Sequence, residues 1–183
     1  MKLEEAFQYT LIKSGARANE YELSISWLEK AAVVIRCNKV REGMEPLAGH
    51  EDFSSFKVYM SDVGLYSAKN NNSHISILGG TIGETAKGAL TENYVAQELR
   101  ANGHKIYYWE SNNRAELDFV IQIENEIIPI EVKSWKGTRS QSLDVFRKKY
   151  DIGKTIRISA KNFGFENGIK SVPLYAVWCI IGK

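Results

Sequence analysis

Residues 116–134, ELDFVIQIENEIIPIEVKS, decide the fold of this chain because they read as two strands joined by a tight turn. Apolar runs at 119–123 and 127–130 flank Glu124 and Asn125, and this pattern predicts a β-hairpin. A strand buried on both faces is nearly all apolar, whereas a strand with one buried face alternates. The hairpin departs from both patterns, because charged side chains stand at its open end.

The charged residues at this end are Asp118 in the first strand and Glu131 and Lys133 in the second. Antiparallel pairing about the turn brings Asp118 and Glu131 near each other, and the two-residue period of a strand puts Glu131 and Lys133 on one face. Two carboxylates beside an ammonium group suit Mg²⁺, which needs only one or two protein carboxylates plus substrate phosphate. The alternative is that the three charges are ordinary solvated strand ends.

The segments around the hairpin predict an α/β domain over residues 67–183. Helical and strand patterns alternate, and their order predicts a mixed sheet covered by helices on both faces. The expected helices are 81–104 and 142–151, and the further strands are 105–111, 154–160 and 173–181.

Residues 1–66 predict a smaller α+β segment in front of this domain. Helical periodicity is followed by two strand-like runs, AVVIRCNKV and SSFKVYMSD, with a long polar loop between them. Helices followed by such a hairpin resemble a winged-helix module. Modules of this kind bind DNA in some proteins and serve as protein-docking or spacer units in others.

The composition is that of a soluble globular protein, with 183 residues, 44% apolar and 25% charged. No apolar run approaches the roughly 20 residues of a membrane span, and the N-terminus lacks the apolar core of a secretion signal. Cys37 and Cys179 lie far apart in apolar contexts, and we expect both to be reduced core thiols. We therefore expect a cytoplasmic protein without a membrane partner. The sequence leaves the oligomeric state open.

The basic residues cluster just after the hairpin, although the net charge of the chain is only +2. Residues 133–157 carry eight basic and two acidic side chains. Four of these, Lys136, Arg139, Arg147 and Lys148, are candidates to contact a nucleic-acid backbone. An equally good interpretation is a solvated helix face.

Glu92 is a further candidate acid, on the predicted helix that precedes the strands. It lies four residues after Gly88, where a missing side chain would let the helix approach the sheet closely. On that geometry Glu92 points into the same site as Asp118. Helical periodicity alone favours a surface glutamate.

These residues together resemble the PD-(D/E)xK nuclease superfamily, which includes restriction endonucleases and Holliday-junction resolvases. The resemblance rests on Asp118, a gap of twelve residues, Glu131-Val132-Lys133, and Glu92 on the helix before them. The order of helices and strands matches that core over roughly residues 83–160. It implies a restriction-endonuclease-like fold.

More closely, the chain resembles the C-terminal region of a group of prokaryotic AAA-type ATPases, a region known only as a domain of unknown function. The resemblance extends from about residue 20 onward. The phrases that carry it are FKVYMSDVGLYS, GALTENYVAQEL, ELDFVIQIENEIIPIEVKS and SLDVFRKKY. It implies an AAA-type ATPase module as a partner.

The superfamily resemblance assigns roles to individual residues. It implies that Asp118 and Glu131 hold Mg²⁺, with Mn²⁺ as a substitute, that Lys133 is the catalytic lysine, and that Glu92 is an accessory acid. Gln141 stands where some superfamily members carry a further polar site residue. The sequence departs from the motif in one respect, because Leu117 and not proline precedes Asp118.

A larger departure is that no P-loop is present. The run DIGKT at 151–155 has Lys148 in place of the first glycine, and it leads into a strand where a P-loop leads into a helix. We therefore expect no ATP site in this sequence, which looks like a fragment or a truncated relative that starts after the ATPase module.

Three functional hypotheses follow. The first is a metal-dependent nuclease or nuclease-like DNA-processing domain acting on nucleic acid, with DNA favoured. The second is a non-catalytic scaffold that binds DNA or protein for a regulatory ATPase, because a fold does not establish an activity. The third is a folding or oligomerisation unit whose charges only end the strands.

Overall fold

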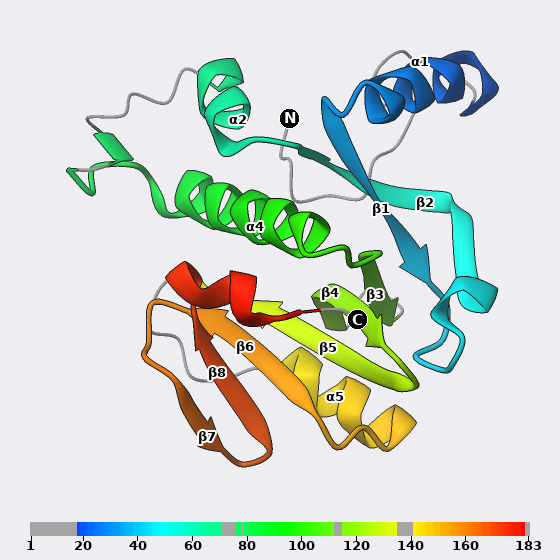
Figure 1. The fold of residues 1–183 in the computed structure, drawn as a ribbon, viewed down its shortest axis with the longest axis vertical. Helices are drawn as coiled ribbons and strands as arrows, with labels where there is room; N and C mark the ends of the chain where they lie inside the picture. The colour runs from blue at the N-terminus through cyan, green and yellow to red at the C-terminus, as the bar shows by residue number, and fades with distance from the viewer. Residues whose placement is uncertain (1–17, 71–75, 78, 112–114, 135–140, 182–183) are drawn as a thin grey trace.

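The computed structural model describes residues 18–70, 76–77, 79–111, 115–134 and 141–181, and within these ranges the chain forms an eight-stranded mixed sheet flanked by helices (Figure 1). The α/β prediction is confirmed. In chain order the elements are α1 (Ala18–Lys30), β1 (Val34–Val40), η2 (Leu47–His50), β2 (Glu51–Met60), α2 (Val63–Lys69), α4 (Glu84–Ala101), β3 (Tyr107–Ser111), β4 (Ala115–Ile123), β5 (Glu126–Val132), α5 (Gln141–Tyr150), β6 (Thr155–Ser159), β7 (Gly164–Glu166), β8 (Ile169–Pro173) and η3 (Leu174–Cys179).

The strand order is β2-β1-β3-β4-β5-β6-β8-β7. The hairpin predicted from residues 116–134 is β4 and β5, which pair antiparallel from Phe119 with Ile130 to Ile123 with Glu126. On the two outer sides of this hairpin, β3 pairs antiparallel with β4 and β6 pairs parallel with β5. The hairpin therefore forms the centre of the sheet, and its open end is fixed by neighbours on both sides.

The N-terminal segment adds a helix and two strands to the same sheet. β1 pairs antiparallel with β2 and parallel with β3, so the sheet continues across the domain boundary predicted at residue 66. That boundary and the winged-helix likeness of the segment stay predictions. The continuity places side chains of β2 beside α4.

Two apolar clusters fill the space above and below the sheet. One lies under α4 and η3, where Val95, Ala96 and Leu99 of α4 follow helical spacing and are almost fully buried. The other lies under α5, whose Leu143 and Phe146 are completely buried. The helices α4 and α5 therefore cover opposite faces of the sheet, as the sequence order predicts.

The prediction of a strand over 173–181 is wrong. β8 ends at Pro173, and the chain then forms the 3-10 helix η3, which packs Ala176 and Val177 into the cluster under α4. A short apolar run does not distinguish a buried strand from a buried helical turn. Cys37 is buried as expected, whereas Cys179 in η3 is exposed.

One buried side chain of α4, Asn93, bonds to the backbone of the edge strand β2. The amide of Asn93 accepts a hydrogen bond from Met60 N at 2.8 Å and donates one to Met60 O at 3.0 Å. These bonds satisfy backbone groups that an edge strand otherwise leaves unpaired. None of the described helices is long and apolar enough to cross a membrane.

Candidate active site

A polar pocket of about 360 Å³ lies between α4 and the open end of the β4–β5 hairpin. It brings together Glu92, Asp118 and Lys133, three of the four residues that the sequence predicted to be catalytic. The lining residues are Lys57, Gly88, Glu92, Glu116, Asp118, Val132, Lys133 and Ser134.

Asp118 lies where β4 and β5 separate, at the open end of the hairpin, and we call this point the fork. The backbone pairing of the two strands reaches Phe119 and Ile130, and beyond this pair the Asp118 carboxylate accepts a hydrogen bond from Val132 N at 2.6 Å. On its other side, β4 has one extra residue relative to β3, between Leu117 and Val120. A bulge of this kind redirects a side chain, and here it helps to place the Asp118 carboxylate in the fork.

Glu131 stands next to the pocket and is not one of its lining residues. Ile128 and Ile130 belong to the cluster under α4, so the alternation along β5 directs Glu131 towards the α5 side. Its Oε1 forms an ion pair with Lys133 Nζ at 2.5 Å. Its Oε2 is buried and has no hydrogen-bond partner among the described residues. Lys133 therefore connects Glu131 to the pocket.

Arg157 on β6 is the register neighbour of Glu131 and is also buried. Within the described part of the chain, the two side chains do not form an ion pair, and Arg157 Nε likewise has no partner. Glu131 Oε2 and Arg157 Nε are thus two buried polar atoms without a partner among the described residues.

The pKa of Asp118 is raised by burial and by the carboxylates near it. Burial raises the pKa of Asp118 well above its ordinary value, and the charges of Glu92 and Glu131 raise it further. Lys57 and the hydrogen bond from Val132 oppose this rise only in part. A bound cation would relieve the same repulsion, because an opposite charge favours the ionised carboxylate.

Sequence reasoning missed two residues that line the pocket, Lys57 of β2 and Glu116 of β4, and a third beside it, Tyr59 of β2. Lys57 Nζ lies 3.2 Å from Glu92 Oε1 and 2.5 Å from Glu116 Oε1. The Tyr59 hydroxyl also donates to Glu92 Oε1, and burial and Glu92 raise the pKa of Tyr59. The signal was a lysine two residues before a tyrosine in a predicted strand, which places both on one face.

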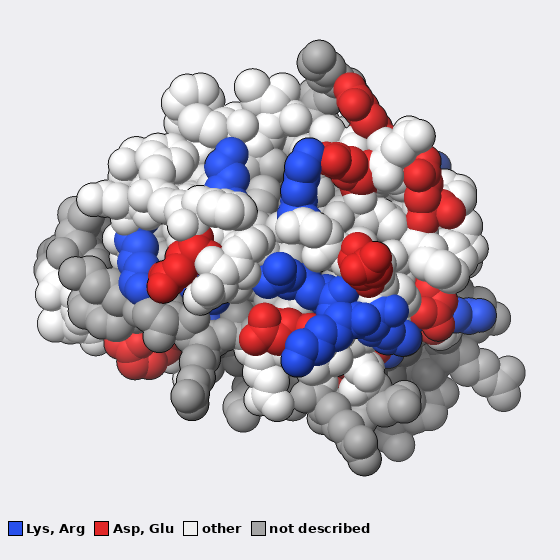
Figure 2. Space-filling model, turned by 90° about the horizontal axis from the view of Figure 1, so that it is seen from below, with Lys and Arg blue, Asp and Glu red and all other residues white. Residues whose placement is uncertain are grey.

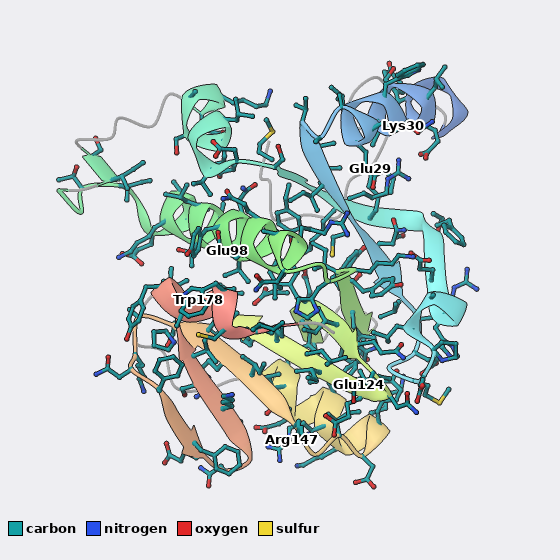
Figure 3. The ribbon with its side chains drawn as sticks, viewed as in Figure 1. Glu29, Lys30, Glu98, Glu124, Arg147 and Trp178 are labelled. Atoms are coloured by element: carbon teal, nitrogen blue, oxygen red, sulfur yellow. The ribbon has the colours of Figure 1, made fainter. Side chains whose placement is uncertain are left out.

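The predicted nucleic-acid contacts do not line this pocket where the structure describes them. Arg147 and Lys148 lie on α5, across the sheet from α4, and Figure 3 shows Arg147 with α5, away from Glu98 of α4. Arg147 donates to Asn167 O at 2.8 Å, at the β7–β8 turn. Lys136 and Arg139 lie outside the described residues.

The surface around α5 and the β7–β8 hairpin is mixed in charge. Figure 2 views the molecule from below, and basic side chains there lie beside acidic ones. Lys154 pairs with Glu126 at 2.6 Å and Lys149 with Glu42 at 3.3 Å. Gln141, the first residue of α5, is exposed and does not line the pocket.

The residues at the fork fit a hard divalent cation with few protein ligands. Asp118 would supply carboxylate oxygens from the pocket, and Glu131 would supply them from beside it, where its Oε2 has no partner among the described residues. Among the described residues, no group of three or more histidine, cysteine or acidic side chains is arranged to hold a metal. Mg²⁺ would therefore take its remaining ligands from water or a substrate phosphate, as this ion commonly does.

Comparison with known proteins relates the chain to two families without known function. No curated protein and no solved structure matches it. Residues 1–75 match a family described as a domain of unknown function (DUF8612). Residues 87–177, just under half of the chain, match another described as a domain of unknown function (DUF4143). The second of these is commonly found in AAA-type ATPases, so the C-terminal part of this chain is similar to a domain that accompanies such ATPases.

Proposed function

We propose that this chain is a metal-dependent nuclease-like domain that processes nucleic acid, with DNA as the favoured substrate, in the cytoplasm and together with an AAA-type ATPase module. The observation that supports this most is the fork. Asp118 and Lys133 line one pocket at the open end of the hairpin together with Glu92 from α4, and Lys133 forms an ion pair with Glu131 beside this pocket. These are the residues to which the PD-(D/E)xK resemblance assigns catalytic roles.

In this proposal Asp118 and Glu131 hold a divalent cation. When bound, the cation polarises a phosphate oxygen and lowers the pKa of a water molecule. Lys133 forms an ion pair with Glu131, and its partly exposed ammonium group lines the pocket, where it stabilises charge developing on the phosphate. The hydrogen bond from Val132 N holds the Asp118 carboxylate in the fork.

The first test is calorimetric titration of Mn²⁺ into the wild-type chain and Asp118→Ala. The wild type should bind Mn²⁺, and the variant should lose at least roughly ten-fold in affinity because a ligand and its charge are removed. The matched control is Asp144→Ala, which removes an exposed carboxylate from α5. Equal Mn²⁺ binding by the wild type and Asp118→Ala would contradict the metal site.

The second test is cleavage of single-stranded, duplex and branched DNA, and of RNA, in Mg²⁺ or Mn²⁺. Asp118→Ala should abolish cleavage if Asp118 holds the ion. Normal turnover by that variant would contradict the proposal.

A non-catalytic scaffold is the second candidate, and one observation favours it. Both lysines of the pocket are already paired with carboxylates, Lys57 with Glu92 and Glu116 and Lys133 with Glu131. When each lysine of a site is already paired with a carboxylate, these charges can stabilise the fold without binding a metal or a substrate. Salt-dependent binding of DNA without any cleavage, in the presence of a divalent cation, would support this candidate.

A further inference from the structure

We propose that the ammonium group of Lys57 acts as a resident cation of the site, which means that it occupies the place between Glu92 and Glu116 that a second divalent ion would otherwise take. Lys57 therefore limits the site to one divalent ion, at Asp118. This inference deepens the proposed function and rests on its metal site. Lys57 does not belong to the predicted catalytic motif. It comes from β2, in the stretch that matches the first of the two families.

The burial of Lys57 argues for a specific role. Its side chain is 4% exposed, although lysine is almost never fully buried without a partner. Burial lowers the pKa of Lys57, but the charges of Glu92, Glu116 and Asp118 outweigh burial and keep it above its ordinary value. The ammonium group is therefore a permanent positive charge inside the pocket.

The contacts of Lys57 resemble those of a bound cation. Two carboxylate oxygens from different elements, α4 and β4, converge on its Nζ at 3.2 and 2.5 Å. The ring of Tyr108 lies 5.3 Å from the same Nζ and offers its face to the charge. Oxygens arranged in this way need to close in by only about an ångström to reach the distances of a bound Mg²⁺.

The charges in and beside the pocket leave room for one divalent ion. Glu92, Glu116, Asp118 and Glu131 are four carboxylates, and Lys57 and Lys133 are the two ammonium groups among them. Two negative charges therefore remain. A single Mg²⁺ at Asp118 neutralises them, whereas a second ion would have to displace Lys57 from its two ion pairs.

The test is calorimetric titration of Mn²⁺ into Lys57→Met, which keeps the length and apolar stem of the side chain but removes its charge. We expect a second equivalent of Mn²⁺ or binding tightened by at least roughly ten-fold, because two carboxylates lose their counter-ion. Lys57→Arg keeps the charge and should retain the wild-type titration. Adding Glu116→Gln to Lys57→Met should reverse the gain.

Lys39→Met is the matched control. Lys39 is also partly buried and paired, with Glu110 at 2.9 Å, but it does not line the pocket. This variant should leave Mn²⁺ binding unchanged. Circular dichroism establishes which variants fold, and Lys57→Gln replaces Lys57→Met if the latter does not.

The outcomes separate this inference from the proposed function. A folded neutral variant with the wild-type stoichiometry and affinity overturns the role of Lys57, and leaves the metal site at Asp118 standing if the wild type binds. A wild type that binds no Mn²⁺ counts against the metal site. A neutral variant that gains binding which the wild type lacks still supports Lys57 as the resident cation.

Discussion

Replacing Asn93 by alanine should lower the free energy of unfolding by more than the loss of any single polar contact on the surface. Asn93 is 2% exposed, and its amide makes two hydrogen bonds to the backbone of Met60 in the edge strand β2. No other described side chain makes these two bonds, so alanine leaves both the N–H and the C=O of Met60 without a partner.

The magnitude follows from those two groups. Leaving a buried polar group unsatisfied costs about 1–3 kcal/mol, and water entering the small space vacated by the amide recovers part of this cost. We expect a loss of about 2–4 kcal/mol in the free energy of unfolding. For a chain of this size, 1 kcal/mol shifts the Tm by about 2–4 °C, so the Tm should fall by roughly 4–16 °C.

The assay is urea denaturation followed by tryptophan fluorescence and circular dichroism, with Gln97→Ala as the control. Gln97 lies on the same helix and accepts one hydrogen bond, from Val63 N at 3.0 Å, in a partly exposed position. Its loss should cost no more than about 1 kcal/mol. If Asn93→Ala costs no more than Gln97→Ala, the two bonds do not hold β2 against α4 and the reasoning is refuted.

Two further predictions concern the fork and the opposite face of the sheet. The pKa of Asp118 is raised in the folded state, so the charge of Asp118 destabilises the fold at pH values above the ordinary aspartate pKa. In a metal-free buffer, Asp118→Asn should therefore be more stable than the wild type. This difference in stability should grow from about pH 4 upward and vanish below it. A stability difference that is the same at pH 3 and pH 7 would contradict this. Phe146→Ala should cost about 3–5 kcal/mol, because Phe146 is completely buried and its ring packs edge-on against Trp109 at 5.1 Å. Thermal unfolding measures this cost, and a loss below 1 kcal/mol would mean that α5 is not firmly packed on the sheet.

Local sequence patterns were sufficient for the centre of the fold. The hairpin of β4 and β5 follows from two apolar runs around one turn, and the helices α4 and α5 follow from apolar residues at helical spacing. These signals are local because the period of a strand or helix is expressed within a few residues. Asp118 and Lys133 could be identified for the same reason, since their charges interrupt such a pattern.

Local sequence patterns could not predict the conformation of the C-terminal apolar run. Residues 173–181 are apolar enough for a strand, yet β8 already occupies the position beside β6 and ends at Pro173. The following residues are buried by crossing onto the face under α4, and Asn102 donates to the carbonyls of Val177 and Ile180 there. Whether an apolar run joins the sheet depends on which neighbours are already in place.

The sequence by itself determined the mixed α/β class, the central hairpin and the candidates Glu92, Asp118, Glu131 and Lys133. Only the tertiary structure decided how these groups meet. The parallel pairing of β1 with β3 brings the N-terminal hairpin into the sheet, and it carries Lys57 to Glu92, 35 residues away in sequence. The fork and the bulge around Asp118 depend on the registers of three strands. Such long-range pairings leave no periodic trace in the chain, because they are fixed by the order of strands and the packing of α4, which together bury a lysine among acids.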